Sequence, residues 1–147
     1  MGTHKITTTI STNNNLDYLK LAIKSIRQNA YYKDMPIIVH AENCNDGTYN
    51  WLDANYHIHD IEYYVYENTD PKRIGGGMDF CVDKVKTEFV NIVHSDMWLA
   101  PNQDIELLKL YDGLDKGTRL IASSFRIQPR IFTNDPNYRP GTVFVDT

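Results

Sequence analysis

The stretch FVNIVHSDM, at residues 89–97, is an apolar run that ends abruptly in a His, a small residue and an Asp. Its apolar residues do not alternate strictly with polar ones, which predicts a strand buried on both faces of a parallel sheet. Ligands of such sheets bind beyond the carboxyl ends of the strands. His94 and Asp96 lie at that end with one residue between them, so together they could hold a divalent cation. An ordinary turn opened by Ser95 and Asp96 explains these nine residues equally well.

On either side of this stretch the chain alternates between strand-like and helix-like segments. A helix of about 14 residues is expected after Asn15, whose side chain is the predicted N-cap. The other helices are expected at residues 48–56, 78–86 and 102–111, and the strands at residues 6–11, 36–41, 61–67, 89–94 and 119–124. Alternation of this kind predicts an α/β fold, a three-layer α/β/α sandwich around a mainly parallel sheet.

Length and composition limit what the chain can be. Its 147 residues predict a single domain over 1–147, with an irregular, proline-broken tail at 125–147 and one more strand at 142–145. The net charge is −4 and no stripe of Lys and Arg occurs, which argues against nucleic acid as a partner. The two cysteines have no metal-type spacing, so free thiols in a cytoplasmic protein are expected. No transmembrane segment is expected, because no apolar run approaches the roughly 20 residues that a membrane span needs.

Polar residues follow each of the first four predicted strands. Because parallel strands end at one edge of the sheet, these loops are expected to converge there, although each alone is more typical of a solvated turn. The residues concerned are Thr12, Asn13 and Asn14 after the first strand, Glu42 and Asp46 after the second, Asp70, Lys72 and Arg73 after the third, and His94 and Asp96 after the fourth.

Two further patterns are weaker. Residues 68–77, NTDPKRIGGG, are expected to form a glycine-rich loop that runs into a helix N-terminus, which would favour an anion such as a diphosphate; a plain loop is an equal alternative. The glycines fit neither a dinucleotide fingerprint nor a Walker loop. His57 and His59 alternate like neighbours on a strand, but no cysteine or carboxylate has the spacing of a zinc site around them.

Three segments in the same order resemble the nucleotide-sugar-binding half of a GT-A glycosyltransferase of the broad family 2 type. The first, STNNNLDYLKLAIKSI at residues 11–26, is similar to the family's P-T-Y-N opening, with Ser11 in place of Pro. The second, AENCNDGT at residues 41–48, resembles D-D-G-S-T-D-G-T. The third, residues 77–97, resembles a helix, a strand and a D-x-D motif, with His-Ser-Asp in place of Asp-x-Asp.

The resemblance implies roles for individual residues. Thr12, Asn13 and Glu42 would cradle the base and ribose of a nucleoside diphosphate sugar, and Asp79 would lie near the donor. Asp96, with His94, would coordinate Mn²⁺ or Mg²⁺; imidazole suits Mn²⁺ better. The other donor-site positions that the resemblance implies are Asp46, Gly77 and Ser95, and the charge of Arg73 suggests that it assists.

The implied function is metal-dependent transfer of a sugar, from a UDP-sugar in most families of this type, to an acceptor that the sequence does not identify as saccharide, lipid or protein. No catalytic base is recognisable, and Asp135 and Asp146 are candidates only because they are acidic. The family usually continues well beyond this length, so 125–147 would be a tail or the start of the acceptor region. The alternatives are an inactive nucleotide-sugar-binding fragment and a metal-dependent nucleotidyltransferase.

Overall fold

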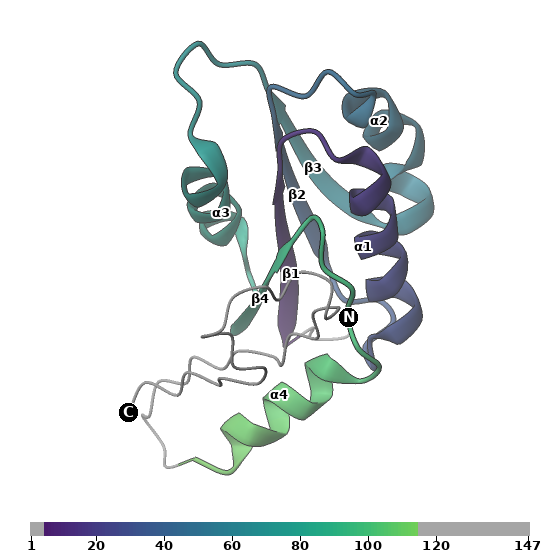
Figure 1. Ribbon diagram of the computed structural model, residues 1–147. Coiled ribbons are helices and arrows are strands. Elements are labelled where there is room, and N and C mark those ends of the chain that lie inside the picture. Colours follow the sequence, from purple (N-terminus) through teal and green to yellow (C-terminus); the bar gives the residue numbers. More distant parts are fainter. Residues whose placement is uncertain (1–4, 115–147) are drawn as a thin grey trace, which may run out of the picture. The chain divides into compact units, whose positions relative to one another are not determined.

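The structure is a computed structural model that describes residues 5–114. It contains four strands and four helices in alternation (Figure 1). In chain order they are β1 (Ile6–Thr12), α1 (Leu16–Asn29), β2 (Ile37–Glu42), α2 (Thr48–His59), β3 (Ile61–Tyr66), α3 (Arg73–Lys84), β4 (Phe89–His94) and α4 (Gln103–Asp112). The strands predicted at 119–124 and 142–145, and the tail at 125–147, lie outside the described residues.

The four strands form one parallel sheet with the order β3-β2-β1-β4. Helices α1 and α2 lie on one side of the sheet and α3 lies on the other (Figure 1). This confirms the α/β fold with a mainly parallel sheet and helices on both faces. The chain divides into two compact units, residues 1–105 and 106–147, and the whole sheet belongs to the first. The single domain over 1–147 stays a prediction.

The core of the first unit lies along the two central strands. Every residue of β1 and β2 is buried, including the threonines of β1. Helix α1 buries one stripe against the sheet, with Leu19, Ile23 and Ile26 fully inaccessible, as its helical spacing predicted. Cys44 and Cys81 are both buried and free. No helix in the part of the chain that the structure describes has the length and apolar character needed to cross a membrane.

The prediction that β4 is buried on both faces is wrong. Asn91 and Val93 are buried, but Val90 and Ile92 on the opposite face are 38% and 48% exposed. The strand lies at the edge of the described sheet, and α3 packs on β1 and β2. The apolar run therefore corresponds to a half-buried edge strand. Within residues 5–114, no helix covers one of its two faces.

The prediction of a long glycine-rich loop at 68–77 is also wrong in its second half. Helix α3 begins at Arg73, so all three glycines lie in its first two turns. Gly77 is buried where the helix meets the sheet: a Cβ there would lie 2.2 Å from Ser11 Oγ and 2.7 Å from His40 Nδ1. The absence of a side chain at Gly77 thus allows close packing of helix on sheet, rather than a flexible turn.

Two local predictions around the other helices need correction. Asn15 does not cap α1 through its side chain, because its backbone is left-handed with φ 65°; the carboxylate of Asp46 accepts from the Leu16 amide at 2.8 Å instead. His57 and His59 belong to the last turn of α2 and not to a strand. No group of three or more His, Cys, Asp and Glu side chains among residues 5–114 is arranged to hold a metal.

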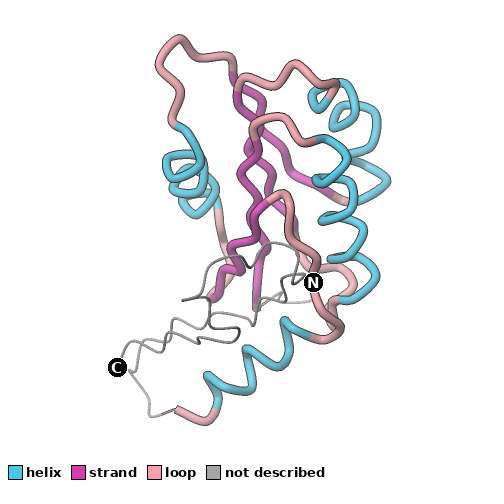
Figure 2. Tube along the Cα trace, in the orientation of Figure 1, coloured by secondary structure: helices cyan, strands magenta, loops and turns pink. Residues whose placement is uncertain are grey.

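Parallel pairing brings the loops that follow β1, β2, β3 and β4 to one end of the sheet, as predicted (Figure 2).

Candidate functional site

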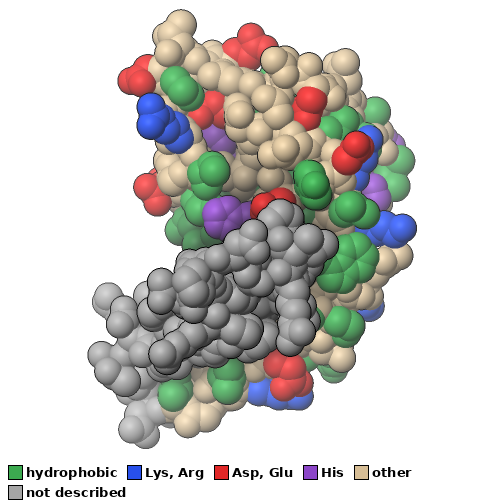
Figure 3. All heavy atoms as spheres, in the orientation of Figure 1, with side chains coloured by type: hydrophobic (Ala, Val, Ile, Leu, Met, Phe, Trp, Pro, Cys, Tyr) green, Lys and Arg blue, Asp and Glu red, His purple; other side chains and the backbone are tan. Residues whose placement is uncertain are grey.

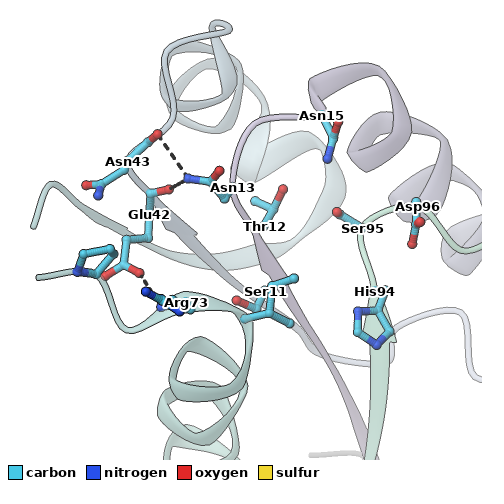
Figure 4. A pocket seen from close by; sticks show the side chains of 12 residues that line it. Ser11, Thr12, Asn13, Asn15, Glu42, Asn43, Arg73, His94, Ser95 and Asp96 are labelled. Atoms are coloured by element: carbon cyan, nitrogen blue, oxygen red, sulfur yellow. Dashed lines mark hydrogen bonds between the residues drawn. The ribbon is translucent and has the colours of Figure 1, made fainter.

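A pocket of about 380 Å³ lies at this end of the sheet, within the usual size range of small-molecule sites. Four segments line it: the carboxyl ends of β1, β2 and β4 with the residues that follow each, and the stretch around the start of α3. Strand β1 lies between β2 and β4 (Figure 4). The lining residues are Ser11, Thr12, Asn13, Asn15, Glu42, Asn43, Pro71, Arg73, Ile74, His94, Ser95 and Asp96. Seven of them are residues for which the sequence predicted a role: Thr12, Asn13, Glu42, Arg73, His94, Ser95 and Asp96.

One wall of the pocket is built around Glu42, the last residue of β2. Glu42 is only 3% exposed, and its carboxylate accepts hydrogen bonds from Asn68 Nδ2 at 2.6 Å and from the Arg73 amide at 3.0 Å. Burial alone would raise the pKa of Glu42, but these hydrogen bonds outweigh it and hold the pKa below its ordinary value. Glu42 is therefore a buried, ionised acid that ties the loop after β3 to the start of α3.

Asparagine side chains hold the neighbouring loops of the same wall. Asn13 Nδ2 donates to the Glu42 carbonyl at 2.6 Å and to the Asn43 carbonyl at 3.2 Å, which joins the loops after β1 and β2. Asn43 and Asn68 exchange two more hydrogen bonds of 2.9 and 2.8 Å. Asn43 has a φ of 51°, a left-handed conformation that asparagine tolerates better than most residues. This side of the pocket is thus fixed before any ligand arrives.

The opposite wall consists of His94, Ser95 and Asp96, which leave the carboxyl end of β4 (Figure 4). Their side chains make no hydrogen bond or ion pair to any residue within 5–114. Asp96 is exposed, whereas His94 is half-buried and paired in register with Ser11. A carboxylate, a hydroxyl and an imidazole, all unengaged within residues 5–114, face the pocket on this side.

Arg73 brings positive charge to the pocket. It is the first residue of α3 and adopts a left-handed φ of 60°, and its amide is bonded to Glu42. The guanidinium is exposed, so it can move to meet an anionic ligand. The structure thus places Arg73 on the lining of the pocket, at the start of a helix rather than in a long loop, and its contact with a ligand stays a prediction.

Three residues for which the sequence predicted donor contacts do not line this pocket. Asp46 caps two helices, because it accepts from the Leu16 amide and from the Thr48 amide and hydroxyl. Gly77 is buried beneath α3, and Asp79 is exposed on that helix. Donor contacts from these three residues stay predictions.

The sequence assigned no role at the site to five of the lining residues: Ser11, Asn15, Asn43, Pro71 and Ile74. Asn43 had a usable signal, since it directly follows Glu42 at a strand end. Pro71 and Ile74 had none, because they reach the pocket only through the place where α3 begins.

The surface around the site carries little concentrated positive charge. On the face shown in Figure 3, the Lys and Arg side chains of the described residues lie apart from one another and form no broad basic patch. This agrees with the absence of a basic stripe in the sequence.

Comparison with solved structures identifies glycosyltransferases of similar fold. S. aureus TarS superposes with a TM-score of 0.63 at 15% identity, over 82% of this chain and 24% of that one. TarS 1–349 in complex with UDP gives 0.60 at 17% identity, over 74% of this chain and 32% of that one. Mannosyltransferase PcManGT from Pyrobaculum calidifontis, in complex with GDP-Man and Mn²⁺, gives 0.65 at 18% identity, over 83% of this chain and 36% of that one.

The chain thus spans about a quarter to a third of the length of these structures. No curated protein matches the sequence significantly. The sequence profile of glycosyl transferase family 2, however, matches residues 7–142. This range includes the four described strands, apart from the first residue of β1, and every described residue of the pocket. This confirms the resemblance found in the sequence, and the chain belongs to glycosyl transferase family 2.

Proposed function

We propose that the pocket binds a nucleoside diphosphate sugar together with a divalent metal, and that the protein transfers the sugar to an acceptor. The observation that carries the proposal is the difference between the two walls. Hydrogen bonds already hold Glu42, Asn13 and Asn43 in place, whereas His94, Ser95 and Asp96 have unengaged side chains within residues 5–114. A preformed wall beside groups that lack partners is what a binding site for a polar ligand requires.

The donor's parts fit different sides of the pocket. Thr12, Asn13 and Glu42 would hold the base and ribose, as the family resemblance implies. Arg73 would face the diphosphate, because a guanidinium makes strong, charge-assisted hydrogen bonds to phosphate oxygens. The solved complexes of TarS 1–349 with UDP and of PcManGT with GDP-Man support a nucleotide donor, and the base and the sugar stay open.

Asp96 and His94 would hold the metal. A carboxylate with an imidazole suits Mn²⁺, whereas Mg²⁺ prefers oxygen ligands alone. Two protein ligands are few, and residues 5–114 contain no larger cluster, so the residues fit a metal that takes further oxygen ligands from the donor's diphosphate and from water. When bound, the metal supplies positive charge that offsets the charge building on the leaving diphosphate.

Donor binding is tested by thermal unfolding of the full chain with Mn²⁺ and UDP or GDP. Binding to the native state raises its stability by about 2.7 kcal/mol at a ligand concentration of 100 Kd, which gives a clear rise in Tm. Asp96→Ala should abolish the metal-dependent part of the rise and leave the Tm of the free protein unchanged. Asp83→Ala, which removes an exposed carboxylate of α3 outside the pocket, is the control and should behave like the parent.

An unchanged Tm with every combination of metal and nucleoside diphosphate would exclude donor binding. An undiminished rise in Asp96→Ala would show that Asp96 is only a turn residue.

Binding of the donor without transfer is the second candidate function. Among residues 5–114, the carboxylates that line the pocket are Glu42 and Asp96; the first is engaged by Asn68 and Arg73, and the second is assigned to the metal. Neither is free to act as a general base. Release of UDP or GDP from a panel of sugar donors, with and without added saccharides, separates the two functions, because a binding-only protein shifts its Tm but releases no nucleotide.

A further inference from the structure

The loop that follows β4 is fixed along helix α1. The Leu99 amide donates to Ser25 Oγ at 2.9 Å, and Asn29 Nδ2 donates to the Leu99 carbonyl at 2.6 Å. Further on, the Asn102 amide donates to the Asn29 carbonyl at 2.8 Å. Leu99 itself is buried. The loop therefore runs from the pocket, where Asp96 lies, to the carboxyl-terminal half of α1.

Two large apolar side chains stand just before this anchor and are not buried by it. Met97 is 39% exposed and Trp98 is 57% exposed, although their neighbour Leu99 is packed against α1. Tryptophan is usually one of the more buried residues in a folded protein. On the other side of Trp98, the Met97 amide donates to the His94 carbonyl at 3.1 Å. A backbone that is fixed on both sides thus presents an indole ring to solvent two residues beyond Asp96.

The same edge of α1 carries two more exposed apolar side chains. Leu21 and Tyr18 lie one and two helical turns before Ser25, on the side of α1 along which the loop runs, and they are 49% and 57% exposed. One turn further back, Asn15 lines the pocket together with Ser95 and Asp96. We call Tyr18, Leu21, Met97 and Trp98 the aromatic ledge; it extends along α1 from the mouth of the pocket.

We propose that the aromatic ledge binds a saccharide ring of the acceptor, next to the donor pocket; this inference rests on the proposed function. A sugar ring has apolar C–H faces and a polar rim of hydroxyl groups. Trp and Tyr match it, because each combines a flat apolar body with a polar tip. Beside the ledge, the Asp17–Lys20 ion pair of 3.6 Å supplies exposed groups that can bind hydroxyls.

The position of the ledge suits transfer. Trp98 follows Asp96 by two residues, so their α-carbons lie within roughly 7 Å of each other. A ring stacked on Trp98 would therefore lie close to the sugar of a donor whose diphosphate is held at Asp96. A lipid acceptor would be served better by a broad apolar surface, whereas the exposed charges of Asp17 and Lys20 border the one seen here.

The chain offers a direct optical test, because Trp51 and Trp98 are its two tryptophans. In a Trp51→Phe variant of the full chain, Trp98 is the one remaining reporter. We expect a saturable change in its emission on titration with at least one of methyl glucoside, methyl galactoside, methyl mannoside, N-acetylglucosamine, maltose and cellobiose, in the presence of Mn²⁺ and UDP. Tyr18→Ala in this background should weaken the response about tenfold. Tyr31→Ala, which removes an equally exposed ring beyond the other end of α1, should leave it unchanged.

Absence of a saturable response to any of these sugars would overturn the proposal. So would equal effects of Tyr18→Ala and Tyr31→Ala, or a strong blue shift with phosphatidylglycerol vesicles but none with sugars, which would assign the ledge to a membrane. The Tm rise with Mn²⁺ and UDP is measured on the same variants. Loss of that Tm rise would contradict the proposed donor site, whereas an intact Tm rise without a sugar response would contradict only the proposed role of the aromatic ledge.

Discussion

Gly77→Ala tests whether close packing of α3 on the sheet determines the stability of this fold. The new methyl group would lie 2.2 Å from Ser11 Oγ, 2.7 Å from His40 Nδ1 and 3.1 Å from His40 Cε1. The Ser11 hydroxyl can rotate away at little cost. The His40 ring cannot, because it is fully buried with the rings of Tyr66 and Phe80 at centroid distances of 5.5 and 5.3 Å. The helix or the ring must therefore move.

The magnitude follows from two opposing effects. Overpacking of a closed core costs about 1–3 kcal/mol, and replacing glycine by alanine inside a helix returns about 1 kcal/mol. The net loss in the free energy of unfolding should therefore be up to about 2 kcal/mol, which lowers the Tm of a domain of this size by up to roughly 8 °C. Urea unfolding followed by circular dichroism measures the first quantity, and a thermal scan measures the second.

Gly75→Ala is the matched control. Gly75 lies in the same helix, and a Cβ there meets nothing within 4 Å, so only the gain in helix propensity remains. This variant should be as stable as the parent or more stable by up to about 1 kcal/mol. If Gly77→Ala is as stable as Gly75→Ala, α3 does not pack on the sheet so closely at Gly77 that a methyl group is excluded.

Two other residues give predictions of similar sharpness. Burial, modified by Glu42 and Lys72, lowers the pKa of His40, whose ring nitrogens find no hydrogen-bond partner within residues 5–114. Between the two pKa values the unfolded chain binds a proton at His40 that the folded chain does not. The contribution of His40 to stability is therefore complete above the unfolded pKa of about 6.5 and is lost as the pH falls below it. Urea unfolding at pH 7.5 and 5.5 should show this loss of stability, and His40→Phe should make the loss smaller. Asp46→Ala removes the carboxylate that caps α1 and α2 and should cost about 1–2 kcal/mol in the same assay at pH 7.5, whereas an unchanged midpoint would mean that other groups cap both helices.

The sheet and its order of elements could be predicted because the signals are local. Each of the four described strands is an apolar or β-branched run of six or seven residues, and polar loops separate it from the next helix. Alternation of strand and helix then leaves few topologies, and parallel pairing brings the loop residues to one edge. For this reason seven predicted residues line one pocket, although each loop alone could have been an ordinary solvated turn.

The errors occurred where a distant residue decides a local structure. Three consecutive glycines favour a loop, yet α3 includes them, because its buried face at Gly77 must approach Ser11 and His40 closely. Asn15 is of a residue type that often caps helices, yet Asp46, 31 residues away in the chain, supplies the cap to α1. Neither contact has a signature within a short window of sequence, since both depend on tertiary packing.

The pocket also explains why His94, a departure from the family motif, need not disturb the rest of the site. The ordering of the site comes from the wall that contains Glu42: it joins the loop after β3 to α3, and Asn13 joins the loops after β1 and β2. His94, Ser95 and Asp96 take no part in that network. A change of side chain at residue 94 would therefore act on the proposed donor and metal rather than on the framework. Substitutions of Glu42 should loosen the framework and the site together, whereas substitutions of Asp96 should remove binding from a protein that is still folded.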